Sequence, residues 1–254
     1  MTSTLLGNRV SETEVCNVPD VPFTRSFHPV HHRDIIRLMK NGIQAVGLEI
    51  CKAEYVLAQK GMQMFSVYDL SNSNSELCWS IGLRNSLNKS LSFSVTAGTR
   101  VFVCSNLCFS GDYLAVRKHT GGMDIDLLGA LAYSTMQMMI PRLRAFQAWH
   151  LGLRNFPLPE TDLKILLVEI MTNYVIPASK FHDFQGLYAN VYDESLWGFH
   201  EAVTDILKGS NLLTLPRKNK ILNHIIDNYI SSLHSANDRL SLGDFYQHRS
   251  LLRL

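Results

Sequence analysis

Arginine, cysteine and asparagine side chains, which between them can hold phosphate, bind metal or attack as nucleophiles, occur together in the segment GTRVFVCSNLCFSG at residues 98–111. Arg100 opens the segment. Cys104, Asn106 and Cys108 alternate along it, so an extended strand would place all three on one face. Both faces are otherwise largely apolar, which is typical of a strand covered on both sides. Since free cysteine packs in cores as a small hydrophobe, we interpret both cysteines as core residues.

The same cysteines leave two chemical alternatives. A structural zinc site needs four thiolate or imidazole ligands, and the sequence offers such a set in Cys78, Cys104, Cys108 and His119. A C-x3-C pair inside an extended strand, however, lacks the tight turn that is usual between zinc ligands. A nucleophilic Cys104 activated by His119 would need an oxyanion hole, and no pattern identifies one. We therefore predict no metal, no cofactor and no catalytic residue, which leaves enzymatic activity open but favours a non-enzymatic protein.

Other polar residues fall where strands of the predicted sheet end. A buried amide such as that of Asn106 costs about 1–3 kcal/mol without a partner, so it either bonds a neighbouring loop or forms a polar anchor at the end of the sheet. GLRNSLNKS at residues 82–90 has the composition of a hairpin. If the strand ends coincide, their cations form a lip for phosphates. The candidate ligand-binding or nucleic-acid-binding residues are Arg84, Asn85, Lys89, Arg100, Asn106, Arg117, Lys118 and His119.

The segment RKHTGGMDID at residues 117–126 joins the last predicted strand to the first long helix. Asp124 and Asp126 are favoured at a helix N-terminus by the helix dipole. With His119 they could instead collect a divalent cation for hydrolysis, although the segment offers few ligands for such a site.

The elements that position these residues follow from two changes of hydrophobic period. Residues 1–30 are polar and contain three prolines, so we predict an extended arm. A helical period follows in HHRDIIRLMKNGIQAVG and ends near Gly47. From residue 48 to about residue 118 the period is two, with turn signals between the runs. This pattern predicts an antiparallel meander of about five to six strands.

Beyond residue 124 the helical period returns, and helices are predicted near residues 124–151, 161–175, 195–208 and 217–233. Pro141 should kink or split the first helix, and Ser195 should cap the third. His200 lies on an apolar helical stripe, so we interpret it as a core histidine. The fold class is α+β: an arm at 1–30, a helix and antiparallel sheet at 31–123, and a helical region at 124–254 packed on the sheet as one compact domain.

Composition narrows the classes of function. With 254 residues, of which 46% are hydrophobic and 18% charged, the chain can bury a sizeable core. Its 24 Lys+Arg and 22 Asp+Glu give a net charge of +2, so nucleic-acid binding would have to come from a local patch. The five cysteines, the absence of a signal-peptide pattern and the lack of an apolar run long enough for a bilayer predict a cytoplasmic protein with no membrane partner. P-loop, dinucleotide, hydrolase-elbow and metalloprotease motifs are missing from the sequence.

Six segments resemble, in their order, the phage- and plasmid-associated proteins grouped as domain-of-unknown-function family number 932. They are FTRSFHPVHHRDIIRLM, GMQMFSVYDL, LRNSLNKS, RVFVCSNLCFSG, RKHTG and SLWGFHEAVTDILK, from about residue 23 to residue 208. Many members carry His-Asp where this chain has Leu87 and Asn88, which weakens hydrolytic or metal chemistry at the hairpin. The resemblance implies carriage on mobile elements within a host-cell cytoplasm, and it supplies no activity. The positions that match its pattern are Arg84, Asn85, Ser86, Arg100, Cys104, Asn106, His119 and Thr120.

Three hypotheses of function follow. The leading one is a non-enzymatic accessory of a phage or plasmid that binds single-stranded or duplex DNA in replication, recombination or protection, with Phe102, Phe109 and Tyr113 available for stacking on bases. The second is an anti-defence protein that binds a host protein or sequesters a small nucleotide signal. The third is a metal-dependent hydrolase or nuclease that uses His119, Asp124 and Asp126. A homo-oligomer is compatible with all three.

Overall fold

The chain forms two compact units in a computed structural model that describes residues 8–71, 77–101, 107–117, 125–208, 210 and 214–237. The first, which we call the sheet unit, comprises residues 1–147 and 207–217. The second, the helical unit, comprises residues 148–206 and 218–254. The boundary predicted at residue 124 coincides with the start of a long helix, whereas the division between the units falls within that helix.

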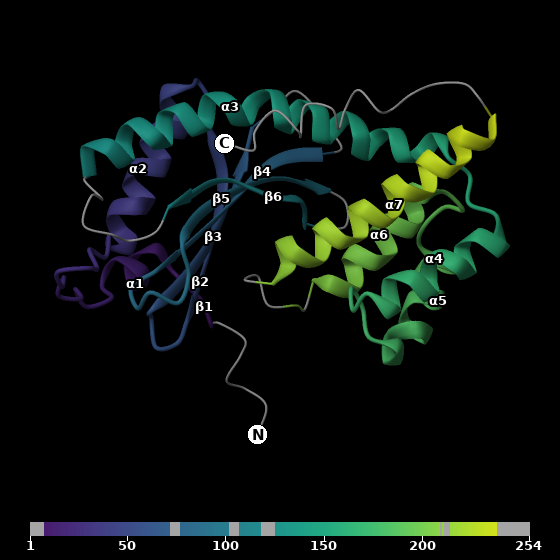
Figure 1. Ribbon diagram of the computed structural model, residues 1–254, viewed down its shortest axis with the longest axis horizontal. Helices are drawn as coiled ribbons and strands as arrows, with labels where there is room; N and C mark the ends of the chain where they lie inside the picture. Colours follow the sequence, from purple (N-terminus) through teal and green to yellow (C-terminus); the bar gives the residue numbers. More distant parts are fainter. Residues whose placement is uncertain are drawn as a thin grey trace. The chain divides into compact units, whose positions relative to one another are not determined.

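The sheet unit contains a six-stranded antiparallel meander, as the period of two predicts (Figure 1). Its strands lie in chain order, each paired with the next. They are β1 (Asn8–Val10), β2 (Ile50–Ala58), β3 (Gln63–Leu70), β4 (Leu77–Ser86), β5 (Phe93–Val101) and β6 (Leu107–Arg117). The observed structure therefore confirms the α+β class, with a sheet followed by a mostly helical C-terminal half.

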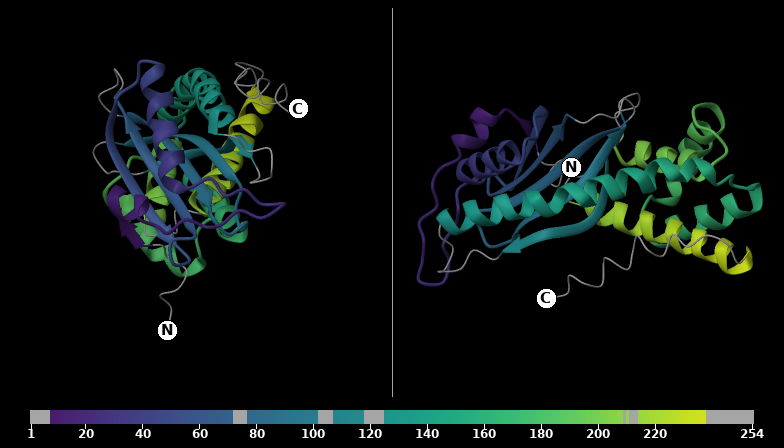
Figure 2. Two further views of the ribbon diagram at one scale, coloured as in Figure 1. Left: turned by 90° about the vertical axis from the view of Figure 1, so that its left-hand side faces the viewer. Right: turned by 90° about the horizontal axis from the view of Figure 1, so that it is seen from above.

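Two helices bury one face of this sheet. They are α2 (His32–Ala45) and the part of α3 (Ile125–Gly152) that belongs to the sheet unit, which Figure 2 shows lying across the strands. Gly42 of α2 lies against the backbone of Ala132 in α3, so the two helices approach closely. Alternate residues of β4 and β5 meet them, because the side chains of a strand alternate between its faces. The shared core includes Ile35, Met39, Ile43, Tyr68, Trp79, Ile81, Leu83, Phe93, Val95, Met136 and Met139.

The opposite face of the sheet bends around Phe109 of β6. Register shifts between β5 and β6 at Val95 and Thr96 mark bulges, which increase twist and bend a strand. The ring of Phe109 thereby lies 6.0 Å from the ring of Phe65 on β3. It also lies against Gly82 on β4, where a Cβ atom would stand 2.7 Å from the Phe109 ring. Glycine at position 82 is therefore required by this close approach. Since Phe109 is fully buried, it is unable to stack on bases as the sequence suggested.

The segment at residues 98–111 belongs to two strands and not to one. Arg100 at the end of β5 pairs with Leu107 at the start of β6, and the two strands are antiparallel. The interpretation of the whole segment as one central strand is therefore wrong. An apolar run that contains a hairpin reads like a single buried strand when no glycine or proline marks the turn. Cys104 and Asn106 lie outside the described residues.

Part of the predicted arm at residues 1–30 has regular structure. Residues 8–10 form β1, and helix α1 (Glu12–Cys16) follows. Ser11 caps this helix: its Oγ accepts from the Glu14 backbone N–H at 3.2 Å, and the Glu14 carboxylate accepts from the Ser11 backbone N–H at 2.7 Å. The sequence Ser-Glu-Thr-Glu carries the signature of this capping box, which the prolines that follow had obscured.

The helical unit contains most of the predicted helices. It includes the end of α3, α4 (Glu160–Thr172), α6 (Leu196–Leu207) up to Ile206, and α7 (Leu215–Asn237) from Lys218. The predicted cap of α6 is confirmed, since the Gly198 backbone N–H donates to Ser195 Oγ at 3.2 Å. Helix α3 continues through Pro141, so the predicted split is absent from this described segment. The sequence analysis missed helix α5 (Phe181–Asn190) and the short turns η1 (Leu153–Asn155) and η2 (Ala178–Lys180).

Aromatic packing and partly buried hydrogen bonds hold the helical unit together. Phe184 of α5 packs edge to face on Phe199 of α6, with ring centroids 5.7 Å apart. Trp149 of α3 donates its indole N–H to Asp227 of α7 at 2.9 Å. Tyr229 of α7 donates to Asp162 of α4 at 2.7 Å. Each long helix is thus tied to another by a specific polar contact.

Replacing Gly198 by alanine should destabilise the helical unit. A Cβ atom there would overlap the backbone carbonyl oxygen of Asp193, which is unable to move without disturbing the Ser195 cap. We expect Gly198→Ala to lower the free energy of unfolding by about 2 kcal/mol or more, measured by urea denaturation. Gly186→Ala in α5 is the control, because a Cβ atom there meets nothing within 4 Å and alanine favours a helix by about 1 kcal/mol. Equal effects of the two changes would contradict this account.

Candidate functional site

The register of the sheet separates the predicted cationic residues into two groups at opposite ends. Arg84 pairs with Ser94, and Arg117 pairs with Phe93, at the end that carries the β4–β5 hairpin. Arg100 lies six residues further along β5, about 20 Å away at the rise of an extended strand. The structure therefore keeps Arg100 away from Arg84, and the single lip expected from the sequence does not form from these two residues.

The other predicted residues divide in the same way. Asn85 and Lys89 lie with Arg84 at the hairpin end. Of Arg117 the backbone is described, and the register places it at the same end. Asn106, Lys118 and His119 lie outside the described residues, as does Asp124 of the hydrolase hypothesis.

Arg100 is engaged in a largely buried ion network on the bent face of the sheet. Its Nη2 lies 2.5 Å from the Glu54 carboxylate of β2, and its Nε lies 2.8 Å from the Asp69 carboxylate of β3. Ser80 of β4 adds a hydrogen bond to Asp69 at 2.6 Å. The side chains of Arg100, Glu54 and Asp69 are 12%, 17% and 6% exposed. This cation is therefore neutralised by two carboxylates and joins strands, so it is unsuited to phosphate binding.

The electrostatics of Glu54 reflect this network. Burial alone would raise the pKa of its carboxyl group, but the charges of Arg100 and Lys52 outweigh burial and lower the pKa below its ordinary value. Cys78, which precedes Ser80 on the same face of β4, behaves differently. Burial and the nearby Asp69 raise its thiol pKa to about 11, so the thiol stays protonated and is a poor zinc ligand or nucleophile.

At the hairpin end, Asn85 and His32 fasten the N-terminal segment to the sheet. The Asn85 amide donates to the Val30 carbonyl at 3.0 Å and to His32 Nδ1 at 2.9 Å. Because Nδ1 accepts a hydrogen bond, the proton of the ring lies on Nε2, which donates to the Gly61 carbonyl at 2.9 Å. Asn85 thus has a structural role: it links β4 through α2 to the β2–β3 hairpin.

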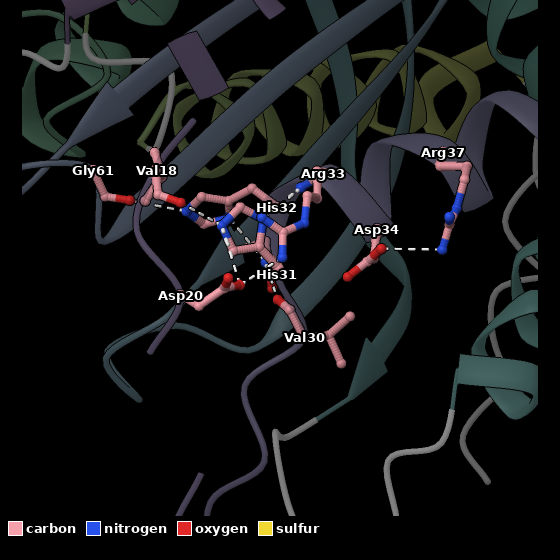
Figure 3. A network of polar contacts seen from close by, with 10 residues as sticks. Val18, Asp20, Val30, His31, His32, Arg33, Asp34, Arg37 and Gly61 are labelled. Atoms are coloured by element: carbon pink, nitrogen blue, oxygen red, sulfur yellow. Dashed lines mark hydrogen bonds and ion pairs between the residues drawn. The ribbon is translucent and has the colours of Figure 1, made fainter. Parts of the chain in front are cut away.

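His31 repeats this arrangement one residue earlier, as Figure 3 shows. Its Nδ1 accepts from the Arg33 backbone N–H at 3.1 Å and so caps α2, while Nε2 donates to the Val18 carbonyl at 2.7 Å. The acids in this region are paired: Asp20 with Arg33 at 2.7 Å and Asp34 with Arg37 at 3.0 Å. These acids are therefore already compensated by neighbouring arginines.

Three exposed cations gather around this fastened segment, and we call Arg25, Lys60 and Lys89 the hairpin-end cluster. Lys60 lies in the β2–β3 hairpin and Lys89 in the β4–β5 hairpin. The two hairpins are joined by a 2.9 Å hydrogen bond from the Asn88 amide to the Gln59 side chain. Lys89 Nζ lies 5.0 Å from the centroid of the Phe27 ring, and Phe27 bridges to Thr24 on the other side of Arg25. Within the described residues, no ion pair involves any of the three cations.

The backbone at these lysines is strained. Lys60 and Lys89 have φ values of 56° and 64°, in the left-handed region that glycine or asparagine normally occupies. Holding a residue with a Cβ atom there costs about 1 kcal/mol or more. Such outliers cluster at functional positions, and here they project lysines from both hairpins at one end of the sheet.

Two further residues of this region of the sheet unit are Arg84 and Phe23. Arg84 is half-buried, and its Nε donates to Ser94 Oγ at 3.2 Å, which holds the guanidinium along the sheet. Phe23 is 77% exposed and lies close to His28, with ring centroids 5.5 Å apart. The segment that carries Arg25 therefore also carries an exposed aromatic ring, two residues earlier in the sequence.

Comparisons of the chain with family models, with curated proteins and with solved structures gave no match. The resemblance to family number 932 therefore stays a prediction. Among the helices that the structure describes, none combines the length and apolar character needed to cross a bilayer.

Sequence reasoning found Lys89, Arg84 and Asn85 but missed Arg25 and Lys60. The signal for Lys60 was present, since Lys60-Gly61 falls between two runs of period two, where a turn is expected. What the sequence lacked was the pairing of that turn with the β4–β5 hairpin through Asn88 and Gln59. Arg25 depends on the Thr24–Phe27 bridge, a local turn within a segment that was predicted to be extended.

The Arg100 network predicts a pH-dependent loss of stability. Arg100→Met should lower the free energy of unfolding by about 2–3 kcal/mol at neutral pH, because two poorly solvated carboxylates lose their cation. Glu54 has a lowered pKa in the folded state, so its stabilisation is present above the unfolded pKa of about 4.3 and is lost as the pH falls through the folded pKa. The difference in free energy of unfolding between the wild type and Arg100→Met should thus become smaller as the pH falls.

Urea denaturation at several pH values measures this difference. Lys52→Met is the matched control, since Lys52 contacts the same Glu54 at 3.5 Å but is 57% exposed. It should cost less than about 1 kcal/mol. A difference for Arg100→Met that stays constant into acid would show that the ion network is not its cause.

Proposed function

We propose that the sheet unit binds nucleic acid through the hairpin-end cluster, as a non-enzymatic, DNA-binding accessory protein. The observation that carries this proposal is the gathering of three exposed cations from segments far apart in the sequence. Each is brought there by a specific contact: Lys89 by Phe27, Lys60 by the Asn88–Gln59 hydrogen bond, and Arg25 by the Thr24–Phe27 bridge. Lysine and arginine side chains at one edge that form no ion pair with another described residue are suited to phosphate oxygens.

Single-stranded DNA is the favoured form. Phe23 is an exposed ring two residues before Arg25 in the sequence, and stacking on an unpaired base contributes about 1–3 kcal/mol without requiring a particular sequence. Duplex DNA keeps its bases stacked and would meet the cations alone. With three phosphate contacts, the logarithm of the affinity for a single strand should fall with the logarithm of salt concentration at a slope of about −2.

The biological setting belongs to the same proposal. If the resemblance to family number 932 holds, the protein would act in the cytoplasm of a host cell on the DNA of a phage or plasmid. The second candidate, an interaction protein that binds a host protein, is favoured by the apolar side chains of Ile165 and Val168, which lie exposed one turn apart on α4. DNA binding remains the first proposal because its surface is assembled by several independent contacts.

Charge reversal at two lysines tests the proposal. In a fluorescence-anisotropy titration with an oligothymidine strand and with a duplex of equal length, Lys60→Glu combined with Lys89→Glu should weaken single-strand binding at least tenfold at low salt. The salt slope of any residual binding should also be smaller. The variant with glutamine at both positions should have an affinity between those of the wild type and the double glutamate variant, because glutamine removes the positive charge without adding repulsion.

The matched control changes two lysines of the helical unit by the same amount. Lys164→Glu combined with Lys180→Glu alters the net charge equally, and its binding should stay within about threefold of wild type. Circular dichroism and thermal denaturation verify that each variant is folded. Absence of binding by the wild type at low salt, or an equal loss in both double variants, would reject the hairpin-end cluster as the DNA site.

A further inference from the structure

Three ionisable side chains that do not belong to the hairpin-end cluster meet in the core of the helical unit. His150 lies on α3, whereas His200 and Glu201 are consecutive on α6. All three are buried, with exposures of 0%, 0% and 1%. The structure confirms that His200 is a core histidine, and it adds two partners that the sequence analysis did not connect with it.

The donor atoms of these residues form a small triangle. His150 Nε2 lies 2.8 Å from Glu201 Oε1 and 3.1 Å from His200 Nδ1, and the third side, from His200 Nδ1 to Glu201 Oε1, is 3.2 Å. A tetrahedral zinc ion with bonds of about 2.0–2.1 Å holds neighbouring nitrogen and oxygen ligands about 3.3 Å apart. Outward movements of a few tenths of an ångström would therefore admit a metal ion.

Hydrogen bonds alone do not satisfy this triangle when Glu201 is ionised. If both nitrogens carry protons toward the carboxylate, two N–H donors face each other across the 3.1 Å side. If one nitrogen carries no proton, its lone pair faces the carboxylate oxygen. One side of the triangle is repulsive in either case. A cation beside all three atoms removes this conflict, because every lone pair then points at the positive charge.

The chemistry of the three groups suits a metal ion. Two imidazoles and a carboxylate are ligands that divalent transition metals accept. One ligand atom from each of His150, His200 and Glu201 lies within 4.8 Å of the others, and all three residues are buried.

Aromatic rings close off the triangle. The Trp197 ring lies 4.5 Å from the His150 ring, and the Trp149 ring lies 5.7 Å from that of His200. The Arg154 guanidinium covers the Trp197 ring at 4.2 Å. A bound ion would thus be held away from bulk water, which suits a structural role. The glutamate can bind through both oxygens, which with two nitrogens gives four donor atoms.

We propose that His150, His200 and Glu201 bind one divalent transition-metal ion, with zinc as the expected ion, which links α3 to α6 inside the helical unit. Imidazole and carboxylate ligands suit zinc better than the oxygen-preferring magnesium or calcium. The sequence predicted no metal at these residues, because ligands about 50 positions apart on two helices leave no spacing motif.

Metal content of the purified full-length protein tests the proposal. The protein is isolated with a histidine-free affinity tag and analysed by inductively coupled plasma mass spectrometry. We expect about one zinc ion per chain, a lower melting temperature after treatment with a chelator, and recovery on addition of one equivalent of zinc. Another transition metal at the same stoichiometry would support the site and change only the identity of its ion.

Variants locate the ion. His200→Ala and Glu201→Gln should each lose most of the metal, whereas the control His182→Ala, an exposed histidine of the same unit, should retain it. If the core variants fail to fold, cobalt added to the chelator-treated wild type still provides a test, since four-coordinate cobalt absorbs visible light. Wild-type protein that contains no metal, and whose melting temperature and cobalt absorption show no response, would overturn the proposal.

Discussion

Burial of one face of the sheet by α2 and α3 is the constraint on which the sheet unit depends. Because strand side chains alternate, packing Trp79, Ile81 and Leu83 against the helices directs the next odd-numbered residue, Asn85, to the same side. There it meets His32 of α2, and this contact fastens the N-terminal segment at the hairpin end. Arg84 is sent to the opposite face by the same alternation. A shift of the register by one residue would exchange the two and remove the support of the hairpin-end cluster.

Fold class was readable from the sequence because it depends on hydrophobic periods. The change from a period of 3.6 to 2 and back reproduced α2, the meander and the helices α3, α4, α6 and α7. Features that do not depend on a hydrophobic period were predicted poorly. No glycine or proline lies between the end of β5 and the start of β6, so the strongest turn signals are missing there, and α5 begins only four residues after Pro177. Pro141 was expected to kink or split α3, and the helix continues through it, because a helix whose Met136 and Met139 pack in the core of the sheet unit tolerates one missing hydrogen bond.

The candidate site was predicted in part for a related reason. Residue types can be read along a chain, but the partner that neutralises a charge cannot. Arg100 looked like a free cation at a strand end, whereas register places it between Glu54 and Asp69 on two other strands. Lys89 had the same appearance and did remain exposed, because its neighbour in the fold is the Phe27 ring and not a carboxylate. The sequence alone therefore identified both Arg100 and Lys89 as candidate cations, but it did not distinguish the neutralised cation from the exposed one.

Charge compensation also explains why a net charge of +2 underestimates the positive charge that lies outside the buried ion networks. Two carboxylates, Glu54 and Asp69, share one cation inside the sheet unit, and Glu201 is a further acid in the core of the helical unit. These buried groups contribute more negative than positive charge to the total, so the remainder of the chain is more positive than the total suggests. Buried charges act over short distances on their own partners, whereas exposed cations set the field that a phosphate backbone meets. An overall balance near neutrality is thus compatible with a local patch for nucleic acid at the hairpin end, which the composition alone did not reveal.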